Sequence, residues 1–144
     1  MATLTFTQDP EAPDLWAAEN VPAGAQRSPI HVMIQTDGEA PTPAASRVVR
    51  ELLARLDEQV LAAADFLLDH YSPEQWLKQG IDPAQLLSAE TAEAMAGQAV
   101  LRALWLFDES GDGYEMWFTV PWDAEHTYDV EFEDGEPVGC TVND

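Results

Sequence analysis

Residues 43–71 carry the feature that most restricts the fold, which is a single apolar stripe at helical spacing. Apolar residues that recur at intervals of three and four occupy one face of an α-helix. Thr42 is placed to cap this helix, and Pro43 fits its first turn. The stripe consists of Val49, Leu52, Leu53, Leu56, Val60, Ala64, Leu67 and Tyr71. The chain must therefore cover one face of a long helix with another layer of structure.

Segments typical of β-strands lie on both sides of this helix. Alternating apolar and polar residues, or runs of β-branched residues, indicate strands. They occur at residues 3–7, 14–21, 29–36, 99–107, 114–120 and 127–132, with a last strand after Gly135. Two shorter helical segments, residues 73–80 and 82–98, precede the later strands. The pattern predicts a single α+β domain over residues 1–144. In it, an antiparallel sheet from the N- and C-terminal strands packs on one long helix plus shorter helices.

The last hairpin turns near Asp134 and Gly135, and two loop lengths are compatible with it. A two-residue loop would pair Phe132 with Pro137, whereas a three-residue loop that begins at Glu133 pairs Phe132 with the residue before Pro137. We favour the longer loop, because a one-residue slip moves every side chain to the other face. The longer loop keeps three residues on the apolar face: Val138, Cys140 and Val142. It predicts that Cys140 is a small buried side chain and not a nucleophile.

The charge of the chain restricts its partners. Twenty-seven acidic residues against six lysines and arginines give a formal net charge of −21, and no lysine or arginine follows Arg102. Nucleic acid and anionic membranes are poor partners for such a surface, because binding them requires clustered cations. A basic protein or a metal ion is the natural counterpart. The alternative is that the acidic residues only keep the protein in solution.

The N-terminal residues MATLTFTQDPEAP have neither the basic start nor the apolar centre of a secretory signal. No apolar run reaches the roughly 20 residues that span a bilayer. The single cysteine fits a reducing compartment. These features favour a cytoplasmic location without a membrane partner.

Residues 108–119 (DESGDGYEMWFT) partly match a calcium-binding loop. Asp108, Ser110, Asp112 and Gly113 stand where such a loop has its first ligands and its glycine. The twelfth position requires glutamate and holds Thr119 instead. A strand also follows where the motif requires a helix. We interpret the segment as a hairpin turn, with calcium as the alternative.

His126 is the other residue with possible chemistry. Together with Asp123 and Glu125 it could offer one nitrogen and two oxygen ligands to a metal. No second histidine stands at metal-binding spacing, and no nucleophile or partner base is indicated. We therefore expect Asp123 to cap a turn and His126 to bond to backbone at the start of a strand. The alternative is a metal-binding module or a small metal-dependent hydrolase centred on His126.

Two tryptophans among acidic residues indicate a binding surface. Trp117 shares a strand face with Glu115, opposite the apolar side chains of the same strand, and Trp122 lies at the following corner. Tryptophans that combine exposure with nearby polar groups are typical anchors of protein interfaces. The predicted partner-binding residues are Glu115, Trp117, Trp122, Asp123, Glu125, Asp129, Glu131 and Glu133.

Residues 120–139 (VPWDAEHTYDVEFEDGEPVG) resemble the ending of small acidic bacterial proteins with a W-D-x-E-H motif. The matching residues are Trp122, Asp123, Glu125, His126, Val130, Phe132 and Gly135, while Thr127-Tyr128 replaces the usual Gly-Leu. Such proteins are regarded as immunity proteins that accompany secreted antibacterial toxins. The resemblance implies a binding role without enzymatic activity. Together with the net charge it leads us to expect a basic toxin domain as the partner, and we expect neither a cofactor nor a metal. A housekeeping adaptor is the further alternative.

Overall fold

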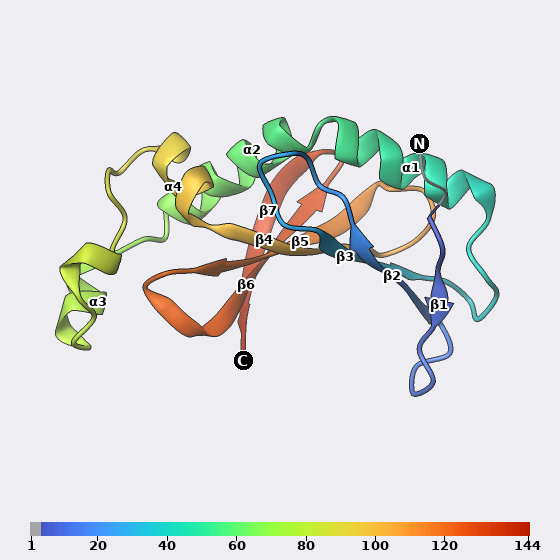
Figure 1. Cartoon of the computed structure of the whole chain (residues 1–144), viewed down its shortest axis with the longest axis horizontal. Helices are drawn as coiled ribbons and strands as arrows, with labels where there is room; N and C mark the ends of the chain where they lie inside the picture. Colours follow the sequence, from blue (N-terminus) through green and yellow to red (C-terminus); the bar gives the residue numbers. More distant parts are fainter. Residues whose placement is uncertain (1–3) are drawn as a thin grey trace.

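The computed structural model describes residues 4–144 as a sheet with helices on one side (Figure 1). The strands are β1 (Thr7–Gln8), β2 (Leu15–Val21), β3 (Ile30–Gln35), β4 (Val100–Leu106), β5 (Gly113–Val120), β6 (Asp123–Glu133) and β7 (Glu136–Asn143). The helices are α1 (Pro43–Ala54), α2 (Leu56–Leu68), α3 (Pro73–Lys78) and α4 (Ala92–Gln98), with a 3-10 turn at Pro83–Gln85. The α+β class is confirmed. The predicted strand at residues 3–7 starts outside the described residues, and β1 covers only its last position.

The seven strands lie in the sheet in chain order, from β1 at one edge to β7 at the other. All neighbours are antiparallel except β3 and β4, which are parallel. The expectation of a purely antiparallel sheet is wrong at this pair. All four helices lie between β3 and β4 in the chain, and a long crossover of this kind can return the chain to the starting end of the sheet.

The predicted long helix is two helices, because the chain leaves helical geometry at Arg55 (φ −111°, ψ 19°). The Arg55 N–H bonds to the Leu52 carbonyl, so α1 closes with a tight turn before α2 begins. The side chain of Thr42 forms no capping bond at the start of α1. Instead, the carboxylate of Glu109 accepts the Thr42 N–H at 2.6 Å. The loop between β4 and β5 therefore supports the start of the helical layer.

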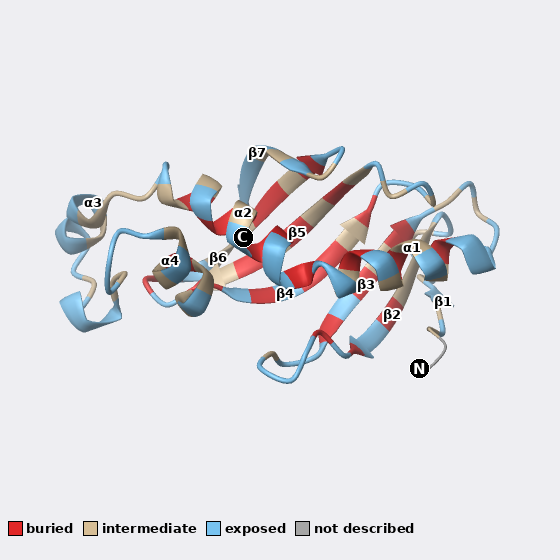
Figure 2. Cartoon of the chain, turned by 90° about the horizontal axis from the view of Figure 1, so that it is seen from above, coloured by how far each residue is buried: buried red, intermediate tan, exposed pale blue. Residues whose placement is uncertain are grey.

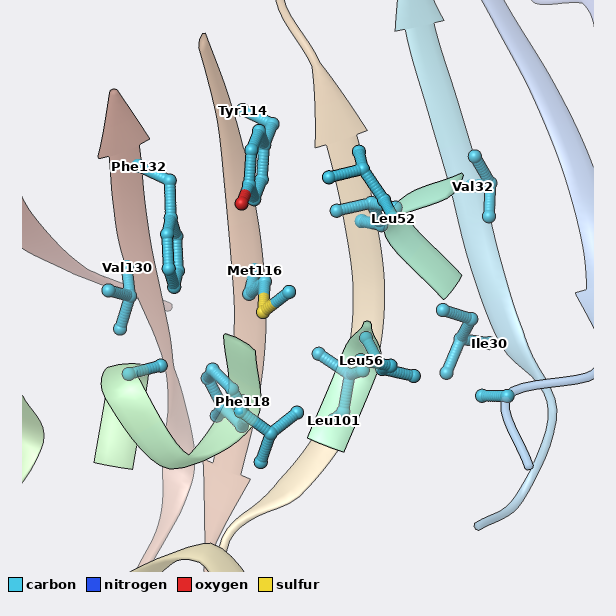
Figure 3. Close-up of a cluster of buried hydrophobic side chains, with 14 of the residues drawn as sticks. Ile30, Val32, Leu52, Leu56, Leu101, Tyr114, Met116, Phe118, Val130 and Phe132 are labelled. Atoms are coloured by element: carbon cyan, nitrogen blue, oxygen red, sulfur yellow. The ribbon is translucent and has the colours of Figure 1, made fainter. Parts of the chain in front are cut away.

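A hydrophobic core fills the space between the helices and one face of the sheet. Figure 2 shows the buried residues as stripes along the strands, on the side that α1 and α2 cover. In Figure 3, Leu52 and Leu56 from the helices lie beside Ile30, Val32 and Leu101 from the sheet. Burial of these aliphatic side chains holds the helical layer on the sheet. The alternation predicted for β5 is confirmed, since its buried residues are Tyr114, Met116, Phe118 and Val120.

One polar contact crosses this core. The hydroxyl of Tyr114 on β5 donates to the side-chain oxygen of Gln59 on α2, and both residues are buried. The Tyr114 ring stacks on Phe132 of β6, with ring centres 4.9 Å apart. Burial raises the pKa of Tyr114 to about 12. The bond satisfies two polar groups that would otherwise be costly to bury, and it fixes α2 above β5.

The last hairpin differs from the prediction. Phe132 pairs with Pro137, so the loop has two residues, Asp134 and Gly135, both with positive φ. Two positive φ values are typical of the turn that matches the twist of a two-residue hairpin. A bulge after Pro137 then holds one extra residue of β7, and beyond the bulge Val130 pairs with Cys140. The predicted three-residue loop is wrong, because the strand corrects its register through the bulge.

Candidate functional site

The predicted partner-binding residues lie on two different sides of the sheet. Glu115, Trp117, Asp129 and Glu131 lie on the face opposite the helices, here called the open face. Trp122 and Asp123 lie on the helix side, where β5 turns into β6. Glu125 and Glu133 are exposed near the two ends of β6. The set therefore divides into an open-face group and a helix-side group, with Glu133 apart.

Two tryptophans form the apolar centre of the open face. Trp117 on β5 meets Trp105 on β4 edge to face, with ring centres 5.4 Å apart. Both are half-buried. The indole N–H of Trp117 donates to Glu115 at 2.9 Å, whereas the indole nitrogen of Trp105 is buried without a hydrogen-bond acceptor in the described chain. Trp105 was missed by sequence reasoning, because residues 99–107 are apolar almost throughout and no alternation separates the two faces.

The carboxylates beside these tryptophans are held away from water. Asp129 is only 3% exposed, and its Oδ1 has no donor with good hydrogen-bond geometry within residues 4–144. The side chain of Thr127 nevertheless lies near enough to act on the Asp129 pKa, which it lowers. The Oδ2 atom of Asp129 accepts a bond from Asn143. Burial raises the pKa of Asp129 and of Glu115, and at Glu115 the charges of Asp129 and Glu131 raise it further. Asp129 was predicted as a partner-binding residue; it lies on the open face beside Trp117, but its side chain is buried.

Trp122 is not an exposed anchor. It is 3% exposed, and its ring contacts Tyr71, with ring centres 5.0 Å apart. Tyr71 follows α2, so Trp122 holds the corner between β5 and β6 against the end of the helical layer. The expectation that Trp122 is available to a partner is wrong. A tryptophan among acidic residues in the sequence can still be covered by a segment far away in the chain.

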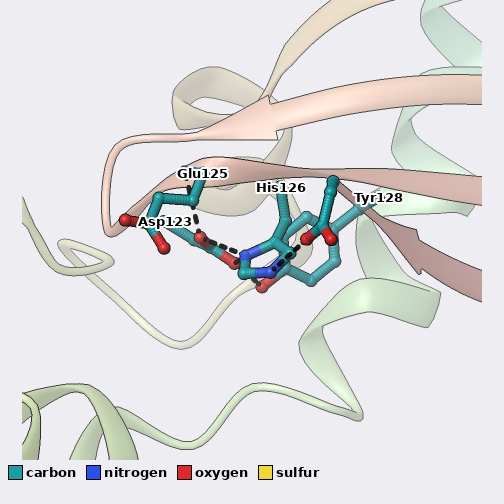
Figure 4. A network of polar contacts seen from close by, with 5 residues as sticks. Asp123, Glu125, His126 and Tyr128 are labelled. Atoms are coloured by element: carbon teal, nitrogen blue, oxygen red, sulfur yellow. Dashed lines mark hydrogen bonds and ion pairs between the residues drawn. The ribbon is translucent and has the colours of Figure 1, made fainter.

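Asp123 lies at the centre of a polar network at this corner (Figure 4). Its carboxylate contacts the Nδ1 atom of His126 at 2.8 Å, and it accepts the Tyr128 hydroxyl at 2.7 Å and the Glu125 N–H at 3.3 Å. The turn-capping role expected for Asp123 is confirmed by the Glu125 bond. The Nε2 atom of His126 lies 3.1 Å from the carboxylate of Asp144. His126 therefore bonds to carboxylates, not to backbone as expected.

The network favours opposite charges on His126 and Asp123. The hydrogen bond to Asp123 holds the pKa of His126 above its ordinary value. Burial alone would raise the pKa of Asp123, but the bonds from Tyr128, His126 and the Glu125 N–H outweigh it and lower the pKa. An aspartate that orients a histidine is also the supporting part of many catalytic sites. Here the other ring nitrogen of His126 contacts Asp144, whose side chain is exposed.

A cavity of about 450 Å³ opens beside the network. The end of α2, α3, and strands β6 and β7 form its walls. Four aromatic residues line it: Tyr71, Trp76, Trp122 and Tyr128. Asp123, Glu125 and His126 supply the polar part of the wall, while Cys140 and Val142 line it from β7. The cavity was not predicted, because it brings α3 beside strands far along the chain.

The loop that partly matches a calcium site is a turn packed on α1. Asp108 accepts bonds from the backbone N–H and the hydroxyl of Ser110, and these bonds lower the pKa of Asp108. Gly111 has φ +78°, and a Cβ atom there would clash with the side chain of Val48. In the described part of the chain, no three histidine, cysteine, aspartate or glutamate residues gather closely enough to hold a metal ion.

Cys140 is exposed, in contrast to the prediction that it is buried. It lies on the edge strand β7, where the helical layer does not cover it fully. None of the helices in residues 4–144 combines the length and the apolar character needed to cross a membrane.

Comparison of the chain with models of protein families, with curated proteins and with solved structures finds no match. The resemblance of residues 120–139 to immunity proteins therefore depends on its motif alone. Trp122, Asp123 and His126 of that motif form the corner described above, whereas Gly135 forms the last turn.

Proposed function

We propose that this protein is a cytoplasmic, non-enzymatic immunity-type protein that neutralises a basic toxin domain by binding it directly. The partner contacts the open face and the exposed acidic residues at its rim. Trp117 and Trp105 supply the apolar anchor, while Glu115, Asp129 and Glu131 supply the charge. Binding excludes the toxin's own substrate from its basic catalytic region.

The cluster of Glu115, Asp129 and Glu131 beside Trp117 is the observation that carries this proposal. The buried carboxylate of Asp129 is costly in the free protein. No lysine or arginine follows Arg102 in the chain, and Arg102 itself bonds to Thr119. A lysine or arginine from a partner would contact the half-buried Glu115 and Glu131 and offset the three neighbouring negative charges, including that of the buried Asp129.

The Asp123–His126 network has a structural role in this proposal. Each of its bonds joins the β5–β6 corner to β6 or to Asp144, so the network holds the corner that Trp122 closes. This assignment distinguishes the proposal from a hydrolase or metal-binding module centred on His126. In the described part of the chain, no group of three metal-binding side chains is close enough together to hold a metal ion.

The proposal is tested with the toxic domain encoded by the neighbouring gene, expressed with and without this protein. We expect the protein to restore growth and to form a complex with the domain. Replacement of Glu131 and Glu133 by lysine should slow association and flatten its dependence on salt. The matched control replaces Glu51 and Glu58 on the helical side, which changes the net charge equally and should have a smaller effect. A toxin that is not neutralised, or a complex equally sensitive to both pairs of changes, contradicts the proposal.

A further inference from the structure

The two edge strands of the sheet differ in length and in the number of charged residues along them. The β1 edge has two residues, and the acidic residues Asp9 and Glu11 follow it closely. The β7 edge has eight residues. Natural sheets usually protect long edges with charges, because the free backbone groups of an edge can pair with another strand. The β7 edge lacks this protection over most of its length.

β7 carries no charge beyond its first residue, while Pro137 and the bulge after it protect only its first part. Residues 137–143 contain no charged residue, although twelve acidic residues follow Arg102 in the chain. Val138 and Val142 are 50% and 51% exposed, and Cys140 is exposed between them. Within residues 4–144, no backbone hydrogen bond joins β7 to any segment except β6. Its outer backbone groups are thus available.

The cavity lies at the same edge. Cys140 and Val142 line it from β7, so a strand added beside β7 would run along its opening. Alternate side chains of an added strand point to the helix side. One of them would lie between the aromatic rings of the cavity and the carboxylates of Asp123 and Glu125. A cation in the cavity would lie against aromatic faces and near the exposed Glu125, whereas the charge of Asp123 is already paired with His126.

We propose that β7 and the cavity form a peptide site, in which an extended segment of a basic protein adds to the β7 edge and places a lysine or arginine side chain in the cavity. Backbone bonds to β7 supply affinity, and the cavity selects the side chain. This inference builds on the proposed function, because it names a second contact of the same partner. A second copy of this chain is a poorer occupant, since each copy has a formal net charge of −21.

Binding can be tested with fluorescent peptide pools of about nine residues, with a central arginine and random Thr, Val, Ile or Ser around it. A matched pool carries citrulline, which has the shape of arginine without its charge. A third pool carries N-methylated backbone amides that cannot pair with a strand. We expect the arginine pool to bind, and the other two to bind about tenfold more weakly or less, as loss of a cation–π contact or of edge pairing implies. Hydrogen exchange of the β7 amides should slow when the arginine pool is bound.

Two variants on α3 locate the side-chain site. Trp76 lines the cavity, whereas its neighbour Leu77 is exposed and does not. Trp76→Ala should weaken binding of the arginine pool about tenfold, and Leu77→Ala should leave it unchanged. Absence of binding, equal binding of the arginine and citrulline pools, or unchanged exchange at β7 would overturn the proposal. So would a dimer of the free protein that protects β7.

The peptide experiment and the toxin experiment test different proposals, and either one can fail without the other. Peptide binding at β7 without protection against the toxin would leave the peptide site standing and remove the immunity function. Protection against the toxin without peptide binding would support the open face alone and remove the β7 site.

Discussion

Trp117 and Glu115 lie two residues apart on β5, and the indole N–H of Trp117 donates to the Glu115 carboxylate at 2.9 Å. This hydrogen bond favours the charged form of Glu115 beside the apolar rings of Trp117 and Trp105. Burial and the charges of Asp129 and Glu131 act in the opposite direction and raise the Glu115 pKa. The indole therefore serves both the apolar and the charged part of the open face.

Trp117→Phe separates these two roles. The phenyl ring keeps an aromatic contact with Trp105 but cannot donate to Glu115. We expect the pKa of Glu115 to rise further, because the one side-chain bond that lowers it is lost. Carbon-detected NMR titration of the glutamate side chains measures the change. An unchanged Glu115 pKa would show that solvent replaces the indole.

Asp129→Asn should stabilise the free protein and weaken binding of a basic partner. The raised pKa means that folded Asp129 holds its proton more tightly than the unfolded chain does. Its stabilising contribution is therefore complete below the ordinary value of 3.8 and is lost as pH rises through the folded pKa. The variant should melt higher than the parent at about pH 7 and close to the parent at about pH 4. If the variant melts at a lower temperature than the parent at neutral pH, Asp129 is not a buried charge without a partner.

His126→Ala should destabilise the protein most at mildly acidic pH. Because its pKa is raised, His126 contributes stability at pH values below the ordinary histidine pKa of 6.5. This stability is lost as the pH rises through the pKa of His126 in the folded protein. The lowered pKa of Asp123 contributes stability above its ordinary 3.8, which is lost as pH falls. The difference in melting temperature should therefore be largest between these two values. Tyr128→Phe is the control, because its lost bond to Asp123 should cost a constant amount from about pH 5 to 8.

Two glycines with similar backbone angles should tolerate alanine differently. Gly135 has φ +83° and open space around it, so Gly135→Ala should cost about 1 kcal/mol from backbone strain alone. Gly111 has φ +78° and lies against Val48 of α1, so Gly111→Ala should cost about 2–3 kcal/mol. Urea unfolding measures both values. Equal costs would show that the loop moves away from α1 without penalty.

The strand faces were predictable from residue alternation, because β5 and β6 each bury one side. Tyr114 and Met116 are buried, and Glu115 and Trp117 lie on the other face, as predicted. The break at Arg55 was not predictable, since the apolar stripe continues through it without proline or glycine. The length predicted for the hairpin loop was wrong for a related reason. Both loop lengths keep apolar residues on one side once a bulge is allowed after Pro137.

The site was predictable only in part. Composition reveals which residues are charged, but it does not reveal which side chains are buried by other segments. Sequence reasoning selected Trp117 and the carboxylates around it. It could not show that Tyr71 covers Trp122, or that Asp129 is buried beside two tryptophans. Nor could it place Trp76 beside β6 and β7. Such contacts join segments far apart in the chain, and no local pattern encodes them.

The parallel pairing of β3 with β4 has a consequence for how the chain reaches this structure. Strands β4 to β7 form successive hairpins, whose contacts are local in sequence and quick to form. β3 must instead wait for the whole helical segment before it meets β4. We therefore expect the half of the sheet that carries both binding surfaces to assemble early, and the β3–β4 seam to close last. Slow steps in folding should lie at that seam, where Trp105 pairs with Met33 of β3.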